Sequence, residues 1–234
     1  MIDFVFSAII GILAALGWFF FLGQVIIQRF CPQIYSWEMI FAASCSISLV
    51  GLSIITPWIP LPSPALMIGG LVFFGYGMWK RIPLPPITIP RLSIPLIATG
   101  ILASLYMIGV IFSPDYSFDS IAYHLPFVHE LAELGTIPFP ISFQNWTDYV
   151  HLVFPKGVET LYGLAVQLHP SFLPILQIAI LIGVIFLTRE LSRKMGVRRV
   201  WLPVVFVLGM NYFFNIYKAF WVEFTLFFFL LALL

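Results

Sequence analysis

The sequence predicts an all-α membrane protein that crosses the bilayer about seven times and carries one long extracytoplasmic loop. Hydrophobic residues fill 61% of its 234 positions and charged residues only 9%, whereas a soluble domain has about 25% charged residues. Apolar runs of about 20 residues, the length that a helix needs to cross a bilayer, recur along the chain. All four histidines and six of the ten acidic residues lie between Ser113 and Pro170, so this segment is the natural place for chemistry.

Seven apolar runs are candidate spans: 4–27, 39–59, 62–79, 92–112, 171–188, 200–217, and 219 onward. The first is too long for the core of a signal peptide, so we expect it to be retained as a span. The third is the weakest, because four glycines between Gly69 and Gly77 lower its helix propensity. The chain ends inside the apolar run 224–234, which indicates the N-terminal part of a longer protein truncated at its C-terminus.

The basic residues indicate the orientation in the membrane. Nine of the eleven fall in alternate connections of the seven-span arrangement, and the positive-inside rule makes those connections cytoplasmic. They are Arg29, Lys80, Arg81, Arg91, Arg189, Arg193, Lys194, Arg198 and Arg199. The N-terminus, the turn 56–64, the loop 113–170 and the turn near Tyr217 are then extracytoplasmic. We expect an integral protein of the plasma membrane, the inner membrane of a bacterium.

Five prolines in the segment 81–95 favour an extended linker and place a boundary near Arg91. Residues 1–91 are expected to be an accessory unit of three helices plus this cytoplasmic linker, and residues 92–234 the core. The two cysteines, Cys31 and Cys45, suggest neither a disulfide nor a metal site. A net charge of +1 gives no indication of nucleic-acid binding, and nucleic acid is not an expected partner.

The long loop should contain two surface helices. Residues 119–135 have an apolar face of Ile121, Leu125, Val128, Leu131 and Leu134. Asp119 or Ser117 can cap this helix, Pro126 should kink it, and Gly135 can end it. The second helix should start at Pro155, continue to Leu168, and carry Glu159 in its first turns.

Several segments, taken in order, are similar to a known superfamily. FDSIAYHLP, LGTIPFP, FPKGVETLYGLA, RELSRKMGVRR and KAFWVEFTLFFFLLAL together resemble the N-terminal half of GT-C membrane glycosyltransferases. That superfamily includes protein O-mannosyltransferases and lipid A aminoarabinose transferases. The resemblance covers about Leu92 to Leu234 and rests on the order and context of these segments.

The resemblance implies an enzyme that moves a sugar from a polyprenyl-phosphate carrier to a lipid, glycan or protein acceptor outside the cytoplasm. It implies that Asp119 is the essential first-loop carboxylate, acting as the base toward the acceptor hydroxyl or as a metal ligand. Glu223 stands where the family commonly has an aspartate and is the second catalytic candidate. The change from aspartate to glutamate keeps the charge and lengthens the side chain.

The residues themselves indicate compatible chemistry. Displacing a phosphate from a sugar carbon needs a carboxylate to take the acceptor proton and a cation to hold the leaving phosphate. Only Lys156 and Lys218 are basic and external, so either could meet the lipid phosphate. The other candidates for substrate binding are Tyr123, His124 and Glu159.

A divalent cation is a further expectation for Asp119. No two of the four histidines have i,i+4 spacing and no cysteine joins them, so magnesium or manganese bridging Asp119 and a phosphate is preferred to zinc. A purely structural role is the alternative for each candidate. Asp119 would then cap its helix, Tyr123 and His124 would anchor at the lipid headgroups, and the lysines would extend to the interface.

Two other classes of function remain open. A transporter of lipids or solutes, with the loop as a gate, would need ionisable groups near the middle of spans, where this sequence has none. A non-catalytic membrane subunit would assemble with partners through its aromatic surfaces. In that case replacing Asp119 would leave function intact.

Overall fold

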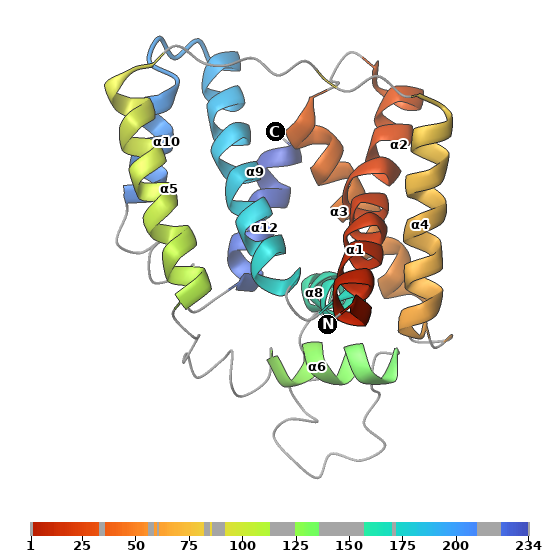
Figure 1. Ribbon diagram of the computed structural model, residues 1–234. Helices are drawn as coiled ribbons and strands as arrows, with labels where there is room; N and C mark the ends of the chain where they lie inside the picture. Colours follow the sequence, from red (N-terminus) through yellow and green to blue (C-terminus); the bar gives the residue numbers. More distant parts are fainter. Residues whose placement is uncertain are drawn as a thin grey trace. The chain divides into compact units, whose positions relative to one another are not determined.

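The computed structural model is helical throughout the part of the chain that it describes, which confirms the all-α prediction (Figure 1). The described residues are 2–32, 36–55, 59, 61–81, 85, 92–112, 125–135, 157–169, 172–209 and 221–233, and no strand occurs among them. Two helical stretches, Ile9–Phe30 and Phe172–Lys194, are long and apolar enough to cross a membrane by length and composition.

The predicted runs correspond to helices with closely similar bounds. The helices are α1 (Ile2–Leu16), η1 (Gly17–Phe21, a π-helical turn), α2 (Leu22–Phe30), α3 (Trp37–Ile55), α4 (Ser63–Trp79), α5 (Ile94–Phe112), α6 (Leu125–Leu134), α8 (Gly157–Leu168), α9 (Phe172–Lys194), α10 (Trp201–Gly209) and α12 (Trp221–Leu233). The second half of the predicted span 200–217 lies outside the described residues.

The chain divides into two compact units, and each is described by itself. The first consists of residues 1–85 and 122–173, and the second of residues 86–121 and 174–234. The helices α6 and α8 of the long loop therefore belong to the same unit as α1 to α4. The predicted boundary near Arg91 lies outside the described residues, and the assignment of residues 1–91 as an accessory unit stays a prediction.

In the first unit, α4 packs closely against the helix formed by α1, η1 and α2. Gly17 and Gly70 face each other, and a Cβ on either one would overlap the opposing backbone. The ring of Trp18 fixes this packing, because its Nε1 donates a hydrogen bond of 2.8 Å to the carbonyl oxygen of Leu66. Small residues permit such close helix contacts where lipid supplies no hydrophobic driving force. The glycines that lower the helix propensity of α4 thus allow its packing.

Polar contacts join the same long helix to α3. The hydroxyl of Ser44 accepts a hydrogen bond of 2.6 Å from the backbone N–H of Gly23 and donates one of 3.1 Å to the carbonyl oxygen of Phe20. Gly23, Gln24 and Ser44 are all buried at this contact. Interhelical hydrogen bonds of this kind contribute about 0.6–2 kcal/mol each inside a membrane.

In the second unit, α5 lies beside α10 (Figure 1). The hydroxyl of Tyr106, buried in α5, donates a hydrogen bond of 2.9 Å to the carbonyl oxygen of Leu208 near the end of α10. Gly183 of α9 meets the ring of Phe228 of α12, and a Cβ at Gly183 would overlap that ring. These contacts fix α5 against α10 and α9 against α12.

Candidate functional site

The structure describes only two of the seven predicted site residues. Asp119, Tyr123, His124, Lys156 and Lys218 lie outside the described residues, and so does the expected cation site at Asp119. Glu223 is the third residue of α12, which agrees with its predicted place at the opening of an apolar helix. Glu159 is in the first turn of α8, as predicted. The roles of all seven residues stay predictions.

Glu159 is an interior residue. Its side chain is 1% exposed, and its neighbours Val158, Thr160 and Leu161 are buried as well. The sequence indicated a first-turn carboxylate favoured by the helix dipole, and its burial is additional information from the structure. Because a buried charge is costly unless it is compensated, this carboxyl group is held in place by its surroundings.

The helix that carries Glu159 is enclosed by the rest of the first unit. Its side chains are buried from Val158 to Val166, and it contacts α1, α3, α4 and α6. A helix that is apolar on one side only would have an exposed face. α8 instead has neighbouring helices on several of its sides. The segment FPKGVETLYGLA therefore leads into a central packing element, not a solvent-exposed surface helix.

The other loop helix, α6, lies against α8. It runs across the direction of α1 and α4 (Figure 1). Gly163 of α8 leaves room for the side chain of Leu131, and Gln167 Nε2 donates a hydrogen bond of 2.9 Å to the carbonyl oxygen of Leu131. Both loop helices are thus fixed to each other.

The end of α6 is also fixed to the turn between α3 and α4. Gly135 ends α6 as predicted, with φ of +68° and its N–H bonded to the carbonyl oxygen of Leu131. The carbonyl oxygen of Gly135 accepts a hydrogen bond of 2.7 Å from the N–H of Leu61. The predicted kink at Pro126 requires a helix before Leu125, and those residues lie outside the described part of the chain. The described helix begins at Leu125, so Pro126 is in its first turn.

The buried face of α6 differs from the predicted one. Val128 and Leu131 are buried as expected, but Leu134 is 54% exposed and Phe127 is fully buried. The prediction of Leu134 as a core residue is therefore wrong, and Phe127, which the predicted face did not include, takes a core position. Packing against α8 selects the face that contains Phe127, so the apolar face is rotated relative to the prediction.

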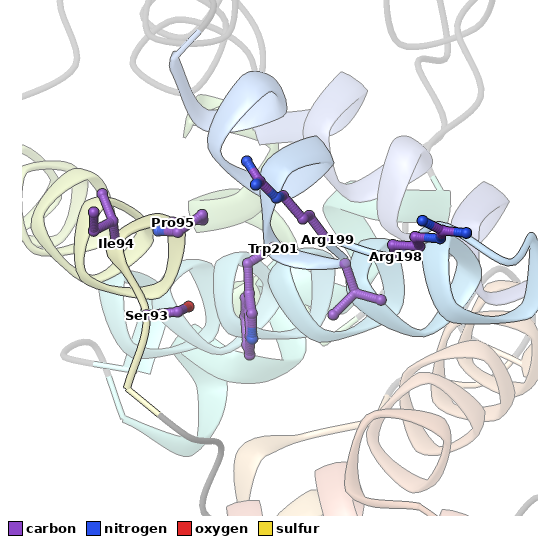
Figure 2. A pocket seen from close by; sticks show the side chains of 7 residues that line it. Ser93, Ile94, Pro95, Arg198, Arg199 and Trp201 are labelled. Carbon is purple, nitrogen blue, oxygen red and sulfur yellow. The ribbon is translucent and has the colours of Figure 1, made fainter.

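The second unit contains a partly open pocket of about 490 Å³. It is lined by Ser93, Ile94, Pro95, Arg198, Arg199, Val200 and Trp201. Figure 2 shows Ser93 at the start of α5 facing the ring of Trp201 at the start of α10. The side chain of Arg199 extends away from that ring in the opposite direction, and the side chain of Arg198 points away from Ser93.

From the sequence, the two pocket arginines indicated the orientation and formed the end of the segment RELSRKMGVRR, but they were not grouped with Ser93 or Trp201. The usable signal was a serine just before one helix and a pair of arginines just before another. Only contact between the two helices brings them together.

Among the described residues, no group of three or more histidine, cysteine, aspartate or glutamate side chains could hold a metal ion. No protein-family model matches the chain, and neither a curated protein nor a solved structure matches it significantly.

Proposed function

We propose that this protein is a membrane-embedded glycosyltransferase of the GT-C type. It crosses the bilayer about seven times and transfers a sugar from a polyprenyl-phosphate donor to a lipid, glycan or protein acceptor on the extracytoplasmic side. The proposal rests on the order of the segments that resemble this superfamily. The supporting structural observation is that the described helices of the long loop are packed into the protein interior.

That packing favours an organised site over a solvated linker. Catalytic groups must be held within about 0.5 Å of the productive geometry, and rigid elements achieve this better than free loops. The residues between α6 and α8 join two helices that pack against each other, and α8 is buried from Val158 to Val166. A gate that opens for transport would have to break the contacts of Gly163 and Gln167 with Leu131.

Contacts inside each unit agree with the proposed orientation. Leu61 and Gly135, which are hydrogen-bonded, both come from connections assigned to the extracytoplasmic side. Ser93 and Arg198, which line one pocket, both adjoin connections assigned to the cytoplasmic side. Each contact joins two connections within one unit, and the positive-inside rule assigns both connections of such a pair to the same side of the membrane.

In the proposed reaction, the acceptor hydroxyl oxygen forms a bond to the anomeric carbon of the sugar. The bond from that carbon to the carrier phosphate breaks, and its electron pair goes to the phosphate. Asp119 takes the acceptor proton, which contributes about 10²- to 10⁴-fold in rate. Lys156 or Lys218 holds the leaving phosphate, and Glu223 completes the site.

The deciding experiment follows transfer of a labelled sugar from a polyprenyl-phosphate donor in membranes that contain the full-length protein. Asp119→Asn keeps the size of the side chain but cannot take a proton, so transfer should fall at least 100-fold at normal protein abundance. Glu133→Gln is the matched control, because Glu133 is an exposed carboxylate of the same loop and should keep near wild-type transfer. Wild-type rates in Asp119→Asn would contradict the enzyme proposal and favour a non-catalytic subunit.

The same assay tests the remaining roles. Glu223→Gln should remove transfer as fully as Asp119→Asn if Glu223 completes the site, and should act weakly if it only anchors a helix end. Lys156→Ala and Lys218→Ala should raise the KM for the phosphate-bearing donor more than the KM for the acceptor. An equal effect on both substrates would remove the lysines from phosphate binding.

A further inference from the structure

The pocket between α5 and α10 combines several features of an anion site. Its volume of about 490 Å³ is within the usual range of small-molecule sites, about 300–1,000 Å³. Two arginines and one serine supply hydrogen-bond donors, and Trp201 supplies an apolar wall. The donors come from two segments that are about one hundred residues apart in the sequence.

The two arginines of this pocket carry its positive charge. Among the described residues, no carboxylate pairs with Arg198 or Arg199. Glu190 is the acidic residue of α9 at this end, and its carboxylate is already bound to Arg193, with a distance of 2.6 Å between Oε1 and Nη2. Arg198 and Arg199 are both exposed and free to meet a ligand.

The pocket is also preorganised. The guanidinium carbon of Arg189 lies 5.2 Å from the ring centre of Trp201, and Phe186 meets the same ring edge-on at 6.3 Å. These two residues of α9 hold the Trp201 wall in place. On the opposite side, the Ser93 hydroxyl accepts a hydrogen bond of 3.4 Å from the N–H of Leu96, so its own proton can be donated into the pocket.

Both helices begin at the pocket, so their positive N-terminal ends add to the arginine charge. α5 starts at Ile94 and α10 at Trp201, and the partial charge at a helix N-terminus favours anions. Arginine forks match the oxygens of a phosphate group better than a lysine does. A planar carboxylate offers fewer oxygens than a phosphate group to the donors at the rim of this pocket.

We infer that this pocket binds a phosphate group, with Arg198, Arg199 and Ser93 as its donors and Trp201 as the wall against which the rest of the ligand packs. In the proposed orientation the site is separate from the transfer reaction, because its residues adjoin connections assigned to the cytoplasmic side, whereas the transfer residues belong to connections assigned to the extracytoplasmic side. The phosphate would belong either to the headgroup of an anionic lipid or to a water-soluble phosphate ester. Basic pockets between helices on the cytoplasmic side are known to hold lipid headgroups.

Native mass spectrometry of the full chain in detergent tests this inference with three probes: phosphatidylglycerol, phosphatidylcholine and inorganic phosphate. A basic residue near an anionic headgroup contributes about 1 kcal/mol, or about fivefold in affinity. Arg198→Gln/Arg199→Gln should therefore raise the Kd for phosphatidylglycerol about 20-fold. The wild type should bind phosphatidylcholine much more weakly, because its headgroup has no net charge.

The matched control is Lys80→Gln/Arg81→Gln, which removes two positive charges from another connection assigned to the cytoplasmic side but none from the pocket, and which leaves Arg193 bound to Glu190. At physiological salt, screening over about 8 Å should limit its effect to about twofold. Competition by millimolar inorganic phosphate would support a soluble ester as the ligand, and its absence a lipid headgroup. An equal loss of affinity in both double variants, or no preference of the wild type for phosphatidylglycerol, would overturn the inference.

Discussion

The close approach of α4 to the first helix should make Gly70 intolerant of a single added methyl group. A Cβ at Gly70 would lie 2.8 Å from both the carbonyl carbon and the Cα of Ala14, and closer still to the carbonyl oxygen. Carbon atoms pack best at about 3.5–4.0 Å. The obstructing atoms belong to the backbone and cannot rotate away, so the two helices would have to separate by roughly 1 Å.

The expected magnitude follows from two opposing effects. Overpacking a close contact costs about 1–3 kcal/mol, while alanine is favoured over glycine in a helix by about 0.8–1 kcal/mol. Gly70→Ala should therefore lower the free energy of unfolding by up to about 2 kcal/mol. For a chain of this size the largest loss corresponds to a Tm lower by about 4–8 °C, measured by thermal unfolding in detergent.

Gly75→Ala is the matched control on the same helix, because a Cβ at Gly75 would meet no atom within 4 Å. It gains the helix propensity of alanine without the overlap, so its Tm should equal or exceed that of the wild type. If Gly70→Ala proved as stable as Gly75→Ala, the reasoning from close helix packing would be refuted.

Three further predictions follow from the described contacts and the proposed orientation. Tyr106→Phe leaves a buried carbonyl oxygen without its hydrogen bond and should lower the free energy of unfolding by about 1–3 kcal/mol. Tyr76→Phe, at an exposed ring, should change the free energy of unfolding little, and equal thermal shifts in the two variants would contradict this reasoning. Glu159→Ala should cost about 1–3 kcal/mol because it empties a buried polar position, and Glu133→Ala on the exposed side of α6 should be neutral in the same melt. Asn145→Cys, with the native cysteines replaced by serine, should react with a membrane-impermeant thiol reagent in intact cells, and labelling only after lysis would reverse the orientation.

Local sequence patterns were sufficient to predict where the helices lie. Apolar runs of about 20 residues predicted the positions of α3, α4, α5 and α9 within a few residues, apart from the end of α9, which extends beyond the predicted residue 188 to Lys194. Gly135 was predicted to end α6, and it does so with positive φ, because only glycine adopts that conformation without strain. Helix formation and termination depend on neighbours in the chain, which the sequence displays directly.

The side on which each helix is buried was decided by tertiary contacts. Periodicity predicted Leu134 on the core face of α6, but in the structure, where α6 contacts α8, Phe127 is buried and Leu134 is exposed. The glycines of α4 counted against a helix by propensity, yet α4 is helical because Gly70 fits the backbone of the first helix. Propensity differences of about 1 kcal/mol per residue are small beside the packing of a whole helix face.

The candidate sites divide in the same way. The sequence predicted a carboxylate in the first turn of α8, but its complete burial depends on helices that are distant in the sequence. The pocket of Ser93, Arg199 and Trp201 exists only because α5 and α10 lie side by side. Burial and pocket formation are properties of pairs of distant segments, and a single sequence carries no record of which distant segments meet.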